Sequence, residues 1–205
     1  MPDTVHSSPE QIAAMTDRAR EVVRLNIAAL EALERSIDVS IGRACDIILS
    51  RPGYLVVTGM GKSGHIGGKI AATLASTGTN AFFVHPAEMS HGDLGMLRKD
   101  VTLLAISNSG ESRELRDPLI YCQREGIPVI GITQRPNSFL GRSSAVCLTL
   151  PNAPEAHPDG LAPPTSTLHW LNGVVAWPRW WAWWLKTCSS RCDRRRRCRS
   201  PRMLR

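Results

Sequence analysis

The first 50 residues carry apolar side chains spaced three and four positions apart. This spacing predicts a long amphipathic helix, because an α-helix completes one turn every 3.6 residues. Its apolar positions are Ile12, Met15, Ala19, Val22, Val23, Ile27, Leu30, Leu33 and Ile37. Ser7-Ser8-Pro9-Glu10 is a suitable helix start. A second helix is predicted through Cys45–Leu49, ended by Arg51-Pro52-Gly53.

From Tyr54 the pattern changes to short, continuously apolar runs separated by glycine turns and helical stretches. Five such runs predict strands at Tyr54–Thr58, Ala81–Val84, Val101–Ile106, Ile127–Thr133 and Ala145–Leu150. Helices are predicted between them at His65–Ser76, closed by Gly78, and at Glu111–Glu125 and Ser138–Arg142. Continuous apolar strands that alternate with helices are typical of a parallel sheet covered on both faces. We therefore expect a three-layer α/β/α domain with about five parallel strands, on which the N-terminal helical segment packs.

A glycine-rich turn follows the first predicted strand. Gly59-Met60-Gly61-Lys62-Ser63-Gly64 matches G-x-G-x-x-G, which is found in dinucleotide-binding turns. Such proteins place an acidic residue at the end of the second strand, whereas here that strand ends in His85-Pro86. A P-loop is excluded, because its first glycine would fall at Val56. Backbone N–H groups at a helix start, with Lys62 beside them, suit a single phosphate; the alternative is a structural turn with an exposed lysine.

A second polar cluster, Ser107-Asn108-Ser109-Gly110-Glu111-Ser112, follows the third predicted strand. Its three hydroxyls and one amide exceed what helix capping needs, and they suit phosphate oxygens and sugar hydroxyls. Glu111 and Glu114 are three positions apart, so one helical turn is expected to bring both toward the same mouth. A carboxylate beside a phosphate indicates proton transfer on the substrate.

Histidines follow the second strand. His85, His91 and Asp93 could bind sugar hydroxyls, transfer protons, hold a divalent metal or serve the structure, and no H-x₃-H or C-x₂-C spacing decides for a metal. Glu155 and His157 lie in a Pro-rich linker, Pro151–Pro164, and by themselves indicate only solvated loop residues.

Composition changes sharply near Leu168. Residues 169–205 hold all six Trp, ten of the 25 basic residues and one of the 18 acidic ones, so their net charge is +9 and that of residues 1–168 is −2. The apolar stretch Trp170–Leu185 contains Pro178 and Arg179 and is shorter than the roughly 20 residues of a membrane span. With no secretory signal evident and single cysteines that read as buried small hydrophobes, we expect a cytoplasmic protein without a membrane segment.

Several segments carry a joint resemblance that runs from about residue 10 to Thr167: Gly59–Gly67, Ser76–Thr79, Phe82–Pro86, Ser90–Met96, Ala105–Glu111 and Gly160–Pro163. Together they resemble the sugar isomerase (SIS) domain of bacterial arabinose-5-phosphate isomerases. It implies a flavodoxin-like sheet and the interconversion of D-ribulose 5-phosphate and D-arabinose 5-phosphate, which supplies the Kdo sugar of lipopolysaccharide. It also implies a homotetramer that needs no organic cofactor.

The resemblance assigns roles to individual residues. Lys62, Glu114 and Glu155 fall on the family's catalytic positions, and His85 also matches a divalent-metal ligand, for example of zinc. The residues expected to contact the sugar phosphate are Ser63, Gly78, Thr79, His85, His91, Ser107, Asn108, Ser109 and Ser112. A non-catalytic phosphosugar-binding module of a regulator is the alternative, although such a module does not need the three catalytic positions together. A dehydrogenase is a more distant alternative.

The resemblance stops in the tail. Relatives continue into a long apolar helix that helps assembly, a His-Pro-Gly-Gly motif with a catalytic His, and paired CBS domains; this chain has Arg196 where that His should come. Clustered Trp, Arg and Cys are what a GC-rich coding sequence yields in a shifted frame. We therefore predict an N-terminal segment 1–52, a SIS domain 53–168, an aberrant disordered tail 169–205 and weak isomerase activity or none. A genuine nucleic-acid arm is the alternative for the tail.

Overall fold

The computed structural model describes residues 7–152 and contains one five-stranded parallel sheet. The strands are β1 (Leu55–Gly59), β2 (Ala81–Phe83), β3 (Thr102–Ile106), β4 (Val129–Thr133) and β5 (Val146–Thr149), in the order β2-β1-β3-β4-β5. All four strand pairs are parallel, with Gly59 opposite Ile106 at the carboxyl end of β1 and β3. The predicted parallel sheet and its five strands are confirmed.

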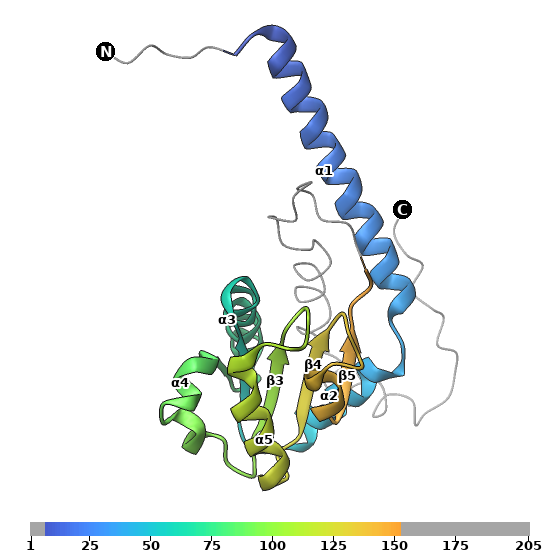
Figure 1. Cartoon of the computed structure of the whole chain (residues 1–205). Coiled ribbons are helices and arrows are strands. Elements are labelled where there is room, and N and C mark those ends of the chain that lie inside the picture. Colours follow the sequence, from blue (N-terminus) through green and yellow to red (C-terminus); the bar gives the residue numbers. More distant parts are fainter. Residues whose placement is uncertain (1–6, 153–205) are drawn as a thin grey trace, which may run out of the picture.

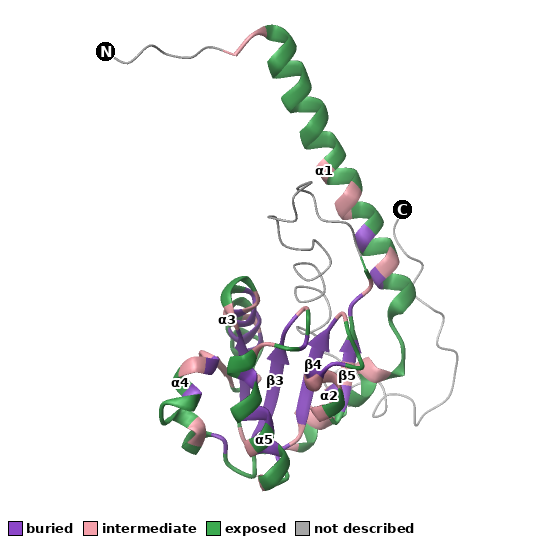
Figure 2. Cartoon of the chain, in the orientation of Figure 1, coloured by how far each residue is buried: buried purple, intermediate pink, exposed green. Residues whose placement is uncertain are grey.

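Helices cover both faces of the sheet, as the continuous apolar strands predicted (Figure 1). Residues alternate between the two faces: Leu55 and Val57 face one apolar cluster with Ile70 and Leu74 of α3, while Val56 faces the other cluster. The first cluster is also lined by α2, and the second by α4, α5 and α6. The three inner strands β1, β3 and β4 are buried along their whole length, as Figure 2 shows for β3 and β4, whereas the edge strand β2 is only half-buried.

Four helices and two 3₁₀ turns lie within the sheet connections of the described residues. Helix α3 covers Gly61–Ser76, α4 Pro86–Ser90, α5 Arg116–Glu125 and α6 Phe139–Ser143, while the 3₁₀ turns η1 and η2 cover Asp93–Met96 and Arg113–Leu115. Two predicted boundaries are wrong. Helix α3 starts at Gly61 instead of His65, so Lys62 and Ser63 belong to its first turn. The helix predicted at 111–125 begins only at Arg116, after the separate 3₁₀ turn η2. Glu111 therefore lies in the loop before both of these elements.

The N-terminal segment forms α1 (Pro9–Ser36) and α2 (Val39–Ser50), as predicted. Ser8 caps α1 through a reciprocal capping box with Gln11. Helix α2 packs against the sheet cluster, whereas α1 has only Ala29 and Leu33 buried. Most of α1 extends away from the sheet domain with its surface exposed (Figures 1 and 2).

The strand order locates the site. Connections from β1 run to one side, to β2, and connections from β3 run to the other side, toward β4 and β5. Ligands of open α/β sheets bind where this direction changes, beyond the carboxyl ends of the strands, so the loops after β1 and β3 are the first candidates. Within residues 7–152 no helix is long and apolar enough to cross a membrane.

Candidate functional site

The loops after β1 and β3 start side by side because glycines allow their backbones to approach. A Cβ added to Gly59 would lie 3.0 Å from the carbonyl oxygen of Ile106 and 3.2 Å from that of Ser63. A Cβ on Gly64 would lie 2.6 Å from the carbonyl oxygen of Gly59. Gly59 and Gly64 therefore let α3 lie against the end of β1 and bring Ser63 close to the end of β3.

The start of α3 is the first polar element of the site. Its N-cap residue, Met60, makes no side-chain capping hydrogen bond, so the backbone N–H groups of the first turn are not satisfied by a cap. Lys62 is exposed in this turn and Ser63 is half-buried. A helix of 16 residues that begins with N–H groups, a hydroxyl and an ammonium group is suited to an anion.

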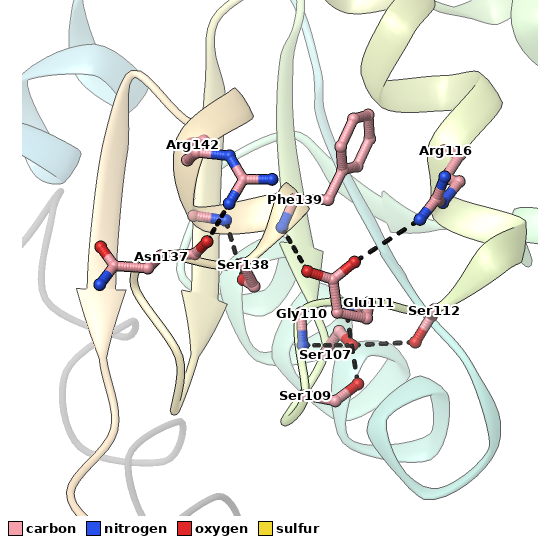
Figure 3. A network of polar contacts seen from close by, with 11 residues as sticks. Ser107, Ser109, Gly110, Glu111, Ser112, Arg116, Asn137, Ser138, Phe139 and Arg142 are labelled. Carbon is pink, nitrogen blue, oxygen red and sulfur yellow. Dashed lines mark hydrogen bonds and ion pairs between the residues drawn. The ribbon is translucent and has the colours of Figure 1, made fainter.

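The second polar element is the loop of residues 107–112, which we call the serine loop (Figure 3). The hydroxyl oxygen of Ser107 lies 2.9 Å from that of Ser112 and accepts the N–H of Gly110 at 3.1 Å. The Ser109 hydroxyl accepts the N–H of Glu111 at 3.2 Å. Ser107 is buried, Ser112 is half-buried and Ser109 is exposed. The predicted hydroxyl cluster is thus a real structural unit, placed next to the start of α3.

The serine loop is also bonded to the end of β4. The carbonyl oxygen of Asn108 accepts the Thr133 hydroxyl and the N–H of Gln134, both at 3.1 Å. The Asn108 side-chain oxygen is buried and has no hydrogen-bond partner among the described residues. A buried acceptor of this kind suits a donor from a ligand, such as a sugar hydroxyl.

Glu111 and Glu114 do not converge as expected. Glu111 accepts the backbone N–H of Phe139 through Oε1 at 2.9 Å, and its Oε2 lies 3.7 Å from Nη2 of Arg116. Glu114 is exposed in η2. The expectation assumed a continuous helix from Glu111. Because α5 begins only at Arg116, the two carboxylates are not on successive turns of one helix.

The histidines follow β2, beside β1. His85 is half-buried, and its Nδ1 accepts the N–H of Ala87 at 3.3 Å, which leaves Nε2 for another partner. His91 is exposed at the end of α4, and Asp93 is exposed at the start of η1. Among residues 7–152, no three His, Cys, Asp or Glu side chains are grouped so that they could hold a metal ion.

Gly78 and Thr79 lie at the amino ends of the strands, opposite the loops after β1 and β3. They connect the end of α3 to the amino end of β2, and the Thr79 N–H donates to Leu74 within the end of the helix. The structure therefore does not bring them together with Lys62 or the serine loop within one chain. Glu155 and His157 lie outside the described residues, as do residues 153–164 of the predicted linker and the whole predicted tail 169–205.

One group of residues near the site was missed. A cavity of about 440 Å³ lies beside the serine loop, lined by Glu111, Gln134, Arg135, Pro136, Asn137 and Ser138. The segment 134–138 follows the carboxyl end of β4, so the rule that directed attention to the ends of the first three strands would also have found it. Gln134 links the serine loop to the chain after β5, because its side-chain nitrogen lies 3.1 Å from Oδ1 of Asn152.

Comparison with known proteins places these features in context. A family model described as SIS domain matches residues 48–170. The arabinose 5-phosphate isomerase KdsD of Francisella tularensis is 51% identical over 154 residues, which cover 74% of this chain and 47% of that protein. The enzyme of the same name from Yersinia pestis is 48% identical over 148 residues, covering 72% of this chain and 45% of that protein. The chain thus spans about half the length of the curated relatives it matches.

A solved structure is similar over its whole length. The protein c3406 of E. coli CFT073, in complex with arabinose 5-phosphate, has a TM-score of 0.75 and 31% sequence identity to this chain. The similarity covers 92% of this chain and all of that one.

Proposed function

The chain belongs to the SIS domain family, and we propose that its site binds a pentose 5-phosphate and interconverts D-arabinose 5-phosphate and D-ribulose 5-phosphate. One observation supports this most: two phosphate-suited elements, the start of α3 and the serine loop, meet at the point where the strand order changes direction. The similarity to enzymes named for this reaction, and to a structure holding the sugar phosphate, supports the same substrate.

The proposed roles follow from the chemistry of each side chain. The first-turn N–H groups of α3, Ser63 and the serine-loop hydroxyls hold the phosphate. His85, His91 and the buried oxygen of Asn108 contact sugar hydroxyls. Lys62 is placed at the same helix start, where its ammonium group can polarise a substrate oxygen.

The reaction is an isomerisation through an enediol. A base removes the proton from C2 of the aldose while the C1 carbonyl oxygen takes up a proton. The resulting enediol is then protonated at C1, while its O2 hydroxyl loses a proton to a base and becomes the C2 carbonyl. Glu114 or Glu155 is the base, and the other residue or Lys62 assists at the oxygens. The substrate's own carbonyl stabilises the carbanion, so the reaction needs no organic cofactor.

A metal at His85 remains a separate proposal. His85 offers one ring nitrogen, Nε2, and the described residues around it do not complete a ligand set. Because residues 7–152 alone do not fit a complete metal site, no step of the mechanism is derived through one. Titration of the chain with Zn²⁺, with His85→Ala as the comparison, tests this point directly.

Two other functions are compared with the isomerase proposal: a phosphosugar-binding module of a regulator and a dinucleotide-binding enzyme. A phosphosugar-binding module of a regulator needs the phosphate-binding elements but not Lys62, Glu114 and Glu155, and their joint presence favours an enzyme. A dinucleotide site is disfavoured because β2 ends in His85-Pro86 without an acidic residue and because the strand order is β2-β1-β3-β4-β5.

The experiment is a calorimetric titration with arabinose 5-phosphate and with NAD, followed by an assay for ribulose 5-phosphate formation. We expect the sugar phosphate to bind and NAD not to bind. Binding without turnover, in this chain and also in a version whose residues 169–205 are replaced by the corresponding segment of the relatives, would favour the regulator module. Tight binding of NAD alone would contradict the proposal.

A further inference from the structure

Glu111 occupies an unusual place for a carboxylate, inside a loop that is suited to anions. From its contacts we infer that Glu111 is a positioning residue, which fixes the serine loop to the start of α6 and takes no part in proton transfer. This inference rests on the proposed function for its ligand, and on the described contacts alone for its structural part.

The first three N–H groups of α6 are all satisfied, two of them by the serine loop. Phe139 donates to Oε1 of Glu111 at 2.9 Å, and Leu140 donates to the carbonyl oxygen of Gly110 at 3.0 Å. Gly141 donates to the hydroxyl of the N-cap residue Ser138 at 3.2 Å. Without such partners these N–H groups would lack acceptors within the protein. Glu111 and Gly110 therefore bind two successive N–H groups of one helix. Figure 3 shows the contact of Glu111 with Phe139.

The second carboxylate oxygen of Glu111 is engaged as well. Oε2 lies 3.7 Å from Nη2 of Arg116, the first residue of α5, and the Arg116 guanidinium lies over the Phe139 ring, 5.2 Å from its centre. Glu111 is thus held between the starts of α5 and α6. The pair is partly exposed, so the ion pair itself contributes little, and the hydrogen bond to Phe139 is the stronger contact.

These contacts explain why a carboxylate is tolerated beside a phosphate site. Both of its oxygens have partners, and Arg116 supplies a compensating positive charge at the same place. A base in the mechanism needs an oxygen within reach of the substrate carbon. Glu114 is exposed and makes no hydrogen bond or ion pair with its side chain within residues 7–152, so the two glutamates have different surroundings.

Three interpretations of Glu111 predict different behaviour of two variants. If Glu111 positions the loop, Glu111→Gln keeps an acceptor for Phe139 and retains binding and turnover, whereas Glu111→Ala weakens arabinose 5-phosphate binding about tenfold. If Glu111 acts only by its charge, both variants bind the phosphate more tightly. If Glu111 transfers protons, Glu111→Gln loses turnover while binding is unchanged.

The test combines titration of the full chain with arabinose 5-phosphate and amide hydrogen exchange of residues 107–112 and 139–141. Glu125→Ala is the matched control, because Glu125 makes an exposed ion pair with Lys99, at 3.9 Å, at the other end of α5. We expect faster exchange in both segments for Glu111→Ala, exchange near that of the unmodified chain for Glu111→Gln, and no local change for Glu125→Ala.

The two parts of the proposal fail separately. If the unmodified chain does not bind arabinose 5-phosphate, the proposed function fails, and the exchange data alone decide whether Glu111 fixes the loop. The inference is overturned if Glu111→Ala leaves hydrogen exchange at residues 107–112 unchanged. It is also overturned if Glu111→Gln loses turnover while its binding of arabinose 5-phosphate is unchanged.

Discussion

Gly110 of the serine loop and Ser138 at the start of α6 lie so close that any side chain on Gly110 would overlap the Ser138 hydroxyl. Gly110 also has a φ of 67°, a left-handed conformation that side chains disfavour. A Cβ there would lie 2.9 Å from Oγ1 of Thr133 as well. The contact between the loop after β3 and the loop after β4 therefore depends on a residue without a side chain.

Gly110→Ala is expected to destabilise the domain and to impair ligand binding, since the serine loop must move away from α6. Gly126→Ala is a matched control, because Gly126 has nearly the same φ, 68°, and nothing within 4 Å of an added Cβ. We expect about 1 kcal/mol of destabilisation for the control and at least about 2 kcal/mol for Gly110→Ala, with backbone strain and overlap combined. Urea unfolding measures both; equal losses would mean that the contact with Ser138 is unimportant.

Lys62→Met is expected to weaken arabinose 5-phosphate binding about tenfold or more, because a charge-assisted contact to the substrate is lost. Lys69→Met is the control, since Lys69 is an exposed lysine two turns later in the same helix. Calorimetric titration measures the difference. Similar affinities for the two variants would remove Lys62 from the site.

In a version whose residues 169–205 are replaced by the corresponding segment of the relatives, Glu114→Gln is expected to reduce turnover by about 10²- to 10⁴-fold, the usual cost of losing an acid–base group, while arabinose 5-phosphate still binds. Asp117→Asn, an exposed acidic residue in the first turn of α5, is the control. The rate of ribulose 5-phosphate formation and the affinity are measured on the same samples. A rate that Glu114→Gln does not change would exclude Glu114 from the mechanism.

Gln134→Ala is expected to loosen the chain after β5, because the Gln134 side chain bonds Oδ1 of Asn152 at 3.1 Å and reaches the Pro151 carbonyl oxygen at 3.4 Å. Glu155 follows Asn152 by three positions, so we expect turnover to fall more than affinity. Gln123→Ala, on the exposed surface of α5, is the control. A loss of affinity with an unchanged rate would place Gln134 at the substrate instead.

Alkaline pH is expected to destabilise the domain through Cys122. Burial raises the pKa of this thiol from its ordinary value of 9.0 to about 12. The folded thiol therefore keeps its proton at pH values where the unfolded thiol loses it. The contribution of Cys122 to the free energy of unfolding is fully present below pH 9 and is lost as the pH rises from about 9 toward about 12. Burial raises the pKa of Cys45 and Cys147 in the same direction.

Urea unfolding at several pH values between 8 and 11 measures this effect, with Cys122→Ala as the comparison. The unmodified chain should lose up to about 1.4 kcal/mol more per pH unit above pH 9 than the variant does. Parallel curves for the two proteins would show that the thiol titrates normally in the folded state.

The sequence by itself determined the parallel α/β architecture, the helical N-terminal segment and the positions of the polar clusters at strand ends. These features are local: continuous apolar runs such as Leu103–Ile106 indicate strands buried on both faces, and capping residues such as Ser8 mark helix starts. The boundary at Glu111 was predicted wrongly, because apolar spacing alone does not distinguish a 3₁₀ turn from the first turn of an α-helix.

Only the tertiary structure decided which clusters meet. Residues close to one another in the sequence, Glu111 and Glu114, have different surroundings, while Gly110 and Ser138, 28 positions apart, are in direct contact. The resemblance grouped Gly78 and Thr79 with Lys62. In the structure they lie at the amino ends of the strands, whereas Lys62 lies at the carboxyl ends. The physical reason is that the order of strands in the sheet, which periodicity along the chain does not encode, sets which loops are neighbours.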